Sequence, residues 1–153
     1  MSKDEVYKKI LSNISSLIEG EDDLIAVMST VSCELFYGFE EFNWVGFYRR
    51  INERTLKVGP YQGSHGCLTI DRDRGVCGAC FRNASIQLEN DVTKAPSHIA
   101  CSSETKSEIV LPILDRDGEV ACVLDIDSTK LDVFDQTDVE HLSRVCEWVS
   151  MRY

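Results

Sequence analysis

Seven cysteines are the residues of this 153-residue chain most able to do chemistry. Three of them, Cys33, Cys122 and Cys146, lie within apolar segments, where a buried cysteine behaves as a small hydrophobe. The other four lie in one stretch, residues 67–101, that is rich in Gly, Asp, Ser and Arg: Cys67, Cys77, Cys80 and Cys101. Thiols in such a polar stretch are predicted to serve chemistry and not to fill a core. The odd number of cysteines in the chain, seven, without a secretion signal, argues against a structural disulfide framework.

The setting of Cys77 admits two interpretations. The segment Gly75-Val-Cys-Gly78 is typical of a helix start, where the helix dipole lowers the pKa of a thiol and activates it. A packed core residue at a helix start is an equally good interpretation. Cys77 and Cys80 also form a Cys-x-x-Cys pair. A single pair is weak evidence for zinc or for thioredoxin-like redox chemistry, because structural zinc needs four ligands.

Three carboxylates form a second group of candidates. Glu108 begins a predicted strand, and Asp125 and Asp127 lie two apart on another, so both aspartates point to one face while Ile126 points to the other. Two aspartates on an otherwise apolar strand are costly unless they bind something, and an ammonium group is a natural partner. Crowded carboxylates also raise one another's pKa, so that one can stay protonated and act as an acid. The competing interpretation is a solvated strand end.

Trp44 lies in an aromatic strand, where core packing is the commoner role, and Tyr48 is a weaker candidate for the same region. The histidines His65, His98 and His141 show no metal-ligand spacing. His98 lies three residues before Cys101 and could lower the pKa of that thiol when protonated. We therefore expect no metal and no cofactor.

The elements that position these residues follow from periodicity and turn signals. Apolar residues at helical spacing predict helices over 4–18, 22–37 and 134–151, with Ser2 or Asp4 capping the first and Asp135 or Thr137 the last. Strands are predicted over 42–50 and 55–58, loops over 59–104 with a short helix at 76–82, and a hairpin of 108–114 and 119–127. Helices at both ends with hairpins between them predict an α+β fold, a central antiparallel sheet flanked by helices in a single domain, 1–153.

Composition excludes several classes of function. The net charge of −10 disfavours binding to nucleic acids and anionic membranes, and no Lys/Arg cluster offsets it. No apolar run approaches the length of a membrane span, and the N-terminal residues carry neither a signal peptide nor a transit pattern. A cytoplasmic protein is expected.

Six segments read together suggest a family. They are Asn43-Trp-Val-Gly-Phe-Tyr48, Gly59-Pro-Tyr-Gln-Gly63, Gly75-Val-Cys-Gly78, His98-Ile-Ala-Cys101, Lys106-Ser-Glu-Ile-Val-Leu-Pro-Ile113 and Val123-Leu-Asp-Ile-Asp-Ser128. In this order and spacing the chain resembles the free methionine-(R)-sulfoxide reductases, which have the GAF fold. The resemblance implies reduction of the R-diastereomer of free methionine sulfoxide, with thioredoxin as the electron donor.

The resemblance also assigns roles. It makes Cys101 the attacking thiol, which becomes a sulfenic acid, and Cys67 the thiol that resolves it as a disulfide; Cys77 competes for either role. It places Glu108, Asp125 and Asp127 in the substrate site, with Glu108 and Asp127 as candidate acids, and Trp44 against the methyl end of the substrate. The sequence departs from the family pattern at Cys80 and at Ser102.

Two rival functions belong to other classes. One is a non-catalytic GAF sensor that binds a small regulatory ligand; such modules usually belong to multidomain chains and would not need three motif cysteines. The other is a cysteine-cluster metal protein, which a thiol titration with and without a chelator would separate from the enzyme. The sequence leaves both a monomer and a homodimer open.

Overall fold

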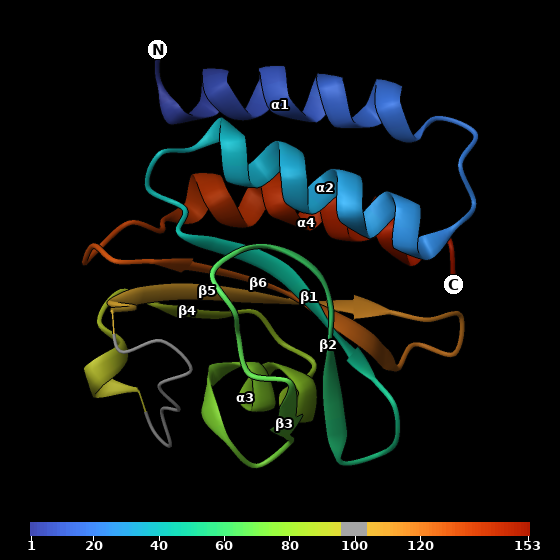
Figure 1. Cartoon of the computed structure of the whole chain (residues 1–153), viewed down its shortest axis with the longest axis vertical. Coiled ribbons are helices and arrows are strands. Elements are labelled where there is room, and N and C mark those ends of the chain that lie inside the picture. Colours follow the sequence, from blue (N-terminus) through green and yellow to red (C-terminus); the bar gives the residue numbers. More distant parts are fainter. Residues whose placement is uncertain (96–103) are drawn as a thin grey trace.

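A computed structural model describes residues 1–95 and 104–153. An antiparallel sheet of six strands separates two layers of helices (Figure 1). On one side of the sheet, α2 (Leu24–Gly38) and α4 (Gln136–Ser150) pack on the strands, and α1 (Lys3–Ile18) lies outside these two helices and packs on both (Figure 1). The short helix α3 (Gly75–Asn83) lies against the other face. This is the predicted α+β arrangement.

The strand order is β3-β2-β1-β6-β5-β4. The strands are β1 (Trp44–Arg50), β2 (Thr55–Gly63), β3 (Thr69–Asp71), β4 (Gln87–Glu89), β5 (Ser107–Leu114) and β6 (Val120–Ser128); a 3₁₀ turn, η1 (Val92–Lys94), follows β4. β6 is central and pairs with both β1 and β5. The β5–β6 hairpin turns as predicted, because Gly118 has the positive φ (79°) that its Asp-Gly turn requires.

The stretch between residues 59 and 95 is more regular than the sequence predicts. β2 continues to Gly63 through Pro60, and β3 and β4 are two further strands of three residues each. β3 pairs with residues 55–57 of β2, so none of the described strands lies on the outer side of β2 at Pro60. A proline, which cannot donate a backbone hydrogen bond, is tolerated at such an edge. Strands of three residues carry too little alternation to be recognised by pattern.

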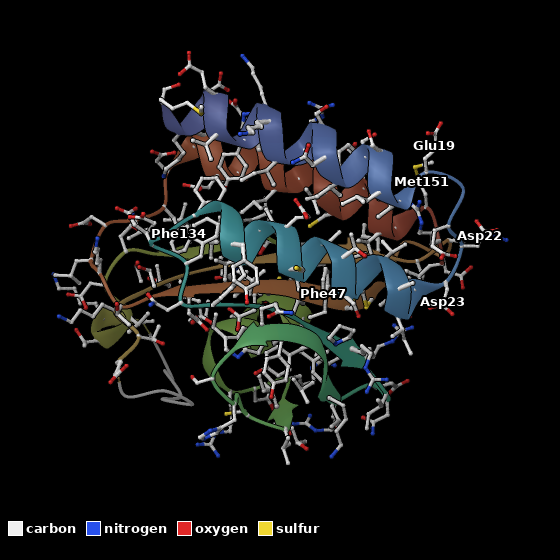
Figure 2. All side chains as sticks on the ribbon, turned by 45° about the horizontal axis from the view of Figure 1, so that its top comes forward. Glu19, Asp22, Asp23, Phe47, Phe134 and Met151 are labelled. Atoms are coloured by element: carbon white, nitrogen blue, oxygen red, sulfur yellow. The ribbon has the colours of Figure 1, made fainter. Side chains whose placement is uncertain are left out.

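Two cores result, one on each face of the sheet. The larger lies under α1, α2 and α4 and includes Phe47 and Phe134, whose side chains lie in the space between the helices and the sheet (Figure 2). The smaller lies under α3 and includes Trp44, Tyr48, Cys77 and Cys80. Alternation along β6 explains the division, because Ile126 faces the larger core while Asp125 and Asp127 face the side of α3.

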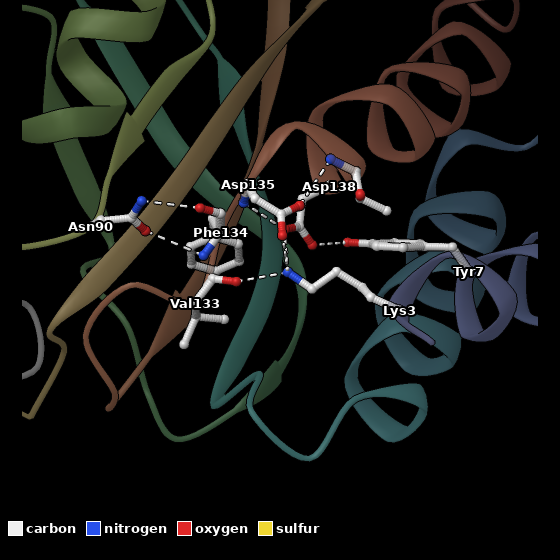
Figure 3. Close-up of polar contacts among 8 residues, drawn as sticks. Lys3, Tyr7, Asn90, Val133, Phe134, Asp135 and Asp138 are labelled. Carbon is white, nitrogen blue, oxygen red and sulfur yellow. Dashed lines mark hydrogen bonds and ion pairs between the residues drawn. The ribbon is translucent and has the colours of Figure 1, made fainter. Parts of the chain in front are cut away.

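A buried polar cluster joins the first helix to the last (Figure 3). The Asp138 carboxylate is fully buried and accepts hydrogen bonds from Tyr7 Oη (2.6 Å), Lys3 Nζ (2.7 Å) and the backbone N–H of Asp135 (2.8 Å). Asp135 is the N-cap of α4, and Ser2 caps α1 in a capping box with Glu5, so both predicted caps are confirmed. The cluster satisfies a buried charge and fixes α1 against α4.

None of the helices in the described part of the chain is long and apolar enough to cross a membrane.

Candidate functional site

Strand register brings the predicted carboxylates together on the face of the sheet that α3 covers. Trp44 on β1 is paired with Asp127 on β6, and Asp127 is paired in turn with Glu108 on β5. Asp125 lies in the parallel row, between Gly46 and Val110. Side chains opposite one another on adjacent strands are close neighbours, so one aromatic ring and three carboxyl groups share a small patch of the sheet. The prediction that Asp125 and Asp127 share a face is confirmed.

The Trp44 ring is held by three contacts. It stacks with Tyr48 and with Tyr61, whose ring centroids are 5.6 Å and 5.1 Å away, and its Nε1 donates to the Ser64 carbonyl oxygen (2.8 Å). Gly46 makes room for it, because a Cβ at that position would lie 2.6 Å from Trp44 Cη2. The ring is therefore a fixed wall, as an aromatic side chain with a satisfied N–H can be.

Helix α3 brings Cys77 over the carboxyl groups. One ligand atom from each of Cys77, Glu108 and Asp125 lies within 4.8 Å of the other two, and all three residues are buried. Glu108 is 8% exposed and Asp125 4%, whereas Asp127 is half-buried. In the part of the chain that the structure describes, the Asp125 Oδ1 atom has no hydrogen-bond partner.

These groups line a pocket of about 400 Å³. Its walls are the sheet, the start of α3, the loop after β2 and the start of β5. The lining combines Trp44 and Tyr48 with Cys77, the carboxylates Glu108, Asp125 and Asp127, and the cationic or titratable His65 and Arg74. Within the described residues, no ion pair involves any of the three carboxyl groups. A small ligand with one cationic group would supply the missing charge.

Burial raises the pKa of each of the three carboxyl groups well above its usual value. For Glu108 the next cause is the Asp125 charge, for Asp125 it is the Asp127 charge, and for Asp127 it is Glu108. Like charges this close disfavour ionisation of all three groups together, so one of them can keep a proton while another ionises and binds a cation. A carboxylic acid facing the pocket can donate a proton, and Asp125 Oδ1 is placed to accept a hydrogen bond from a ligand.

The structure favours one of the two interpretations of Cys77. Burial, followed by the Asp125 charge, raises the pKa of its thiol, which agrees with a packed core residue at a helix start and not with a thiol activated by the helix dipole. Desolvation of a fully buried thiolate outweighs the dipole of a helix of nine residues. The prediction that Cys80 serves chemistry and does not fill a core is wrong, because Cys80 is fully buried in the smaller core.

The other predicted residues are distributed as follows. Cys67 is half-buried, packs against the smaller core and takes part in a disulfide. Cys101 and His98 lie outside the described residues. His141 is remote from the pocket and pairs with Asp4 (2.8 Å) on the helical side of the molecule. Cys122 and Cys146 are buried as predicted, whereas Cys33 is only half-buried.

Two features of the site escaped the sequence analysis. Tyr61 stacks on Trp44, and the Ser64 carbonyl oxygen accepts a hydrogen bond from the Trp44 N–H. Gly63 carries the chain from β2 into that loop with a φ of +118°, a conformation that favours glycine. The signal was present in Gly59-Pro-Tyr-Gln-Gly63, but its meaning depends on the pairing of β2 with β1.

Comparisons with known proteins agree with this architecture. Residues 19–151 match the GAF domain family. The GAF domain-containing protein A of Dictyostelium discoideum is 42% identical, covering 94% of this chain and 90% of its own length. The free methionine-R-sulfoxide reductase of Saccharomyces cerevisiae is 35% identical over 98% of this chain and 87% of its own. The X-ray structure of the Neisseria meningitidis free methionine-R-sulfoxide reductase with its substrate superposes with a TM-score of 0.94, at 35% identity, covering 99% of this chain and 90% of that one.

The fold and the matched residues define a GAF domain. Within that class, the chain belongs to the family of the free methionine-R-sulfoxide reductases, as the six sequence segments predicted.

Proposed function

We propose that this protein reduces free L-methionine-(R)-sulfoxide to methionine. The observation that carries the proposal is the cluster of three carboxyl groups, Glu108, Asp125 and Asp127, that lines a pocket with an aromatic wall. Membership in a family whose relatives are named for this reaction supports the substrate. The names of those relatives support the assignment of this protein to the oxidoreductases.

The substrate matches the pocket group by group. Its ammonium meets Asp125, whose Oδ1 has no hydrogen-bond partner among the described residues, and its methyl end lies against Trp44. The polar sulfoxide oxygen faces Glu108 or Asp127, whose raised pKa values suit one of them to keep a proton and donate it. Each of the three distinctive groups of the substrate then meets a complementary group of the protein.

The chemical step needs an activated thiol and two electrons. The thiolate of Cys101 attacks the sulfoxide sulfur while a carboxyl group protonates the oxygen, which gives methionine and a cysteine sulfenic acid. The Cys67 thiol condenses with the sulfenic acid, forming a disulfide and releasing water. The dithiol of thioredoxin reduces that disulfide by exchange and is itself oxidised. The raised pKa of Cys77 disfavours it as the attacking thiol.

Selectivity for the free amino acid supplies the test. The enzyme is assayed with thioredoxin, thioredoxin reductase and NADPH on free methionine-(R)-sulfoxide, on the S-form and on N-acetylmethionine-(R)-sulfoxide. We expect turnover of the first alone, because the acetyl group removes the cation that the buried carboxyl groups require. Comparable efficiency on the acetylated substrate would refute the ammonium site.

A non-catalytic GAF sensor would use the same pocket. It would bind methionine sulfoxide or another small ligand without consuming NADPH. Binding of the R-form without turnover under any dithiol reductant therefore favours the sensor.

A further inference from the structure

We infer that the pocket is also a binding site for a thiophilic divalent cation of the zinc class, held by Cys77 Sγ and by one carboxylate oxygen each of Glu108 and Asp125. The metal site itself does not depend on the proposed reductase activity. Its consequence, competition with the substrate, does rest on that function.

The three ligand atoms already converge. They lie within 4.8 Å of one another, whereas atoms around a tetrahedral zinc ion, at about 2.0–2.3 Å from the metal, stand about 3.5 Å apart. Moving each atom inward by about 1 Å or less closes the site, which is within the reach of small side-chain rotations. Cys77 comes from α3, Glu108 from β5 and Asp125 from β6, so three packed elements fix the arrangement.

An independent observation points to a ligand at this place. Asp125 is 4% exposed, yet its Oδ1 has no hydrogen-bond partner within residues 1–95 and 104–153, and the same residue lines the pocket. An unpartnered carboxylate oxygen in the interior is costly and is stabilised when a cation arrives. The absence of an ion pair on Glu108, Asp125 or Asp127 among the described residues leaves the site with excess negative charge once it ionises.

The donor set selects the kind of metal. A thiolate ligand favours zinc and cadmium over magnesium and calcium, which prefer all-oxygen sites. Three protein ligands leave the fourth position of a tetrahedral ion open toward the pocket, where water can bind. Binding displaces the thiol proton of Cys77 and the protons that the carboxyl groups hold, so affinity should increase with pH.

Occupation of the site would switch the enzyme off reversibly. The ion would take the carboxylate that receives the ammonium of the substrate, and it would bind an acid needed for protonation. Zinc should therefore act as a competitive inhibitor that a chelator removes. Cys77 would then have a use that the attack and resolution steps do not give it.

Cobalt(II) substitution tests the site without an activity measurement. Reduced protein is titrated with Co²⁺ under argon, and the thiolate-to-cobalt charge-transfer band is recorded in the near ultraviolet. We expect one equivalent to give the band in the wild type, and zinc to abolish it. The Cys67→Ser/Cys101→Ser double variant should keep the band, because Cys77 remains. Cys77→Ser should lose it.

Matched controls separate the site from the other thiols and from misfolding. Cys33→Ser, which removes a half-buried thiol on α2, should leave the band unchanged. Asp125→Asn and Glu108→Gln retain the thiol, but each removes a direct ligand. Each should therefore weaken Co²⁺ binding by more than the roughly 10- to 100-fold that is typical when a residue hydrogen-bonded to a metal ligand is lost. A band that persists in Cys77→Ser and disappears in the double variant would overturn the proposal, as would no band in the wild type.

A second measurement addresses competition. In the thioredoxin-coupled assay zinc should raise the apparent KM for methionine-(R)-sulfoxide without changing kcat, after control of the coupling enzymes, and methionine-(R)-sulfoxide should weaken Co²⁺ binding. Simultaneous binding of both would overturn the competition. Absence of reductase activity with an intact cobalt band would instead refute the proposed function and leave the metal site standing.

Discussion

At the scale of single residues, the three carboxyl groups have different work to do, although they share one patch of the sheet. Asp125 is the most buried of the three, and one of its oxygens has no hydrogen-bond partner among the residues described, which suits it to bind a cation. Glu108 and Asp127 lie in one cross-strand row with Trp44. The division predicts separable kinetic effects.

Substitution of these carboxyl groups should split KM from kcat. Asp125→Asn should mainly weaken substrate binding, by about 2–5 kcal/mol, because a desolvated charge-assisted contact is lost. Whichever of Glu108→Gln and Asp127→Asn removes the proton donor should lower kcat with little change in KM. Steady-state kinetics on free methionine-(R)-sulfoxide measure both. Equal losses of kcat in all three variants would contradict the division of roles.

The thiols can be ordered by single-turnover experiments. Cys101→Ser should release no methionine, since no nucleophile remains. Cys67→Ser should still release one equivalent, because attack precedes resolution, and should then stop. Methionine is quantified after mixing reduced protein with substrate in the absence of thioredoxin. A full single turnover by Cys101→Ser would make Cys77 the nucleophile in spite of its raised pKa.

Gly46→Ala probes the aromatic wall. Its added methyl would lie 2.4 Å from Tyr61 Cβ and 2.6 Å from Trp44 Cη2, so the rings must shift. We expect a loss of about 1–3 kcal/mol in the free energy of unfolding, a changed tryptophan fluorescence and a higher KM. Gly59→Ala, whose nearest side-chain neighbour is Arg49 at 3.2 Å, is the control and should cost less. Wild-type fluorescence and KM in Gly46→Ala would show that the wall does not position the substrate.

At the scale of secondary structure elements, strand register is what assembles the site. β6 lies between β1 and β5, so a side chain on β6 can touch both neighbouring strands. Helix α3 covers the face of the sheet that carries Asp125 and Asp127. The opposite face depends on the fit of α1 and α4 (Figure 3). The site and this helix contact lie on different sides of the sheet and should be separable by mutation.

Asp138→Asn should destabilise the helical layer without touching the pocket. The amide leaves Lys3 without its closest carboxylate and weakens the hydrogen bond from Tyr7, so we expect the free energy of unfolding to fall by about 3–5 kcal/mol. Urea denaturation followed by circular dichroism measures it. Tyr7→Phe should cost less, and KM at a temperature where the variant is folded should not change. If Asp138→Asn leaves the free energy of unfolding unchanged, the cluster contributes nothing to stability.

At the scale of the whole molecule, the buried acids make stability depend on pH. Their pKa values are raised, so between about pH 4, where unfolded carboxyls titrate, and the raised values the folded protein holds more protons than the unfolded chain. Stability is therefore highest in acid within this window and falls as pH rises, by up to about 1.4 kcal/mol per pH unit for each group. The groups with lowered pKa, such as Asp73, act at the acidic end and do not oppose this trend.

Urea unfolding at about pH 5 and about pH 8 measures the effect. Glu108→Gln should reduce the difference between the two values. Asp22→Asn, an exposed change in the turn between α1 and α2 (Figure 2), should leave it as in the wild type. A wild type more stable at the higher pH would contradict the assignment of protonated acids in the pocket.

The sequence by itself determined the elements with strong local signals. Helical periodicity with caps at Ser2 and Asp135, and alternation around the turn at Gly118, act within a few residues, so a pattern in the chain reports them directly. The shared face of Asp125 and Asp127 follows from the two-residue period of a strand. Six ordered segments were enough to indicate the family.

Only the tertiary structure decided the rest. Asp127 meets Glu108 on one side and Trp44 on the other, through a register that pairs segments about 20 to 80 residues apart, which no local pattern encodes. The pKa of the Cys77 thiol depends on how deeply α3 packs. Desolvation raises this pKa while the helix dipole lowers it, and desolvation is the larger effect only in the assembled fold. Spacing along the chain can place a thiol at a helix start, but the free energy of its charge is set by the neighbours that folding brings around it.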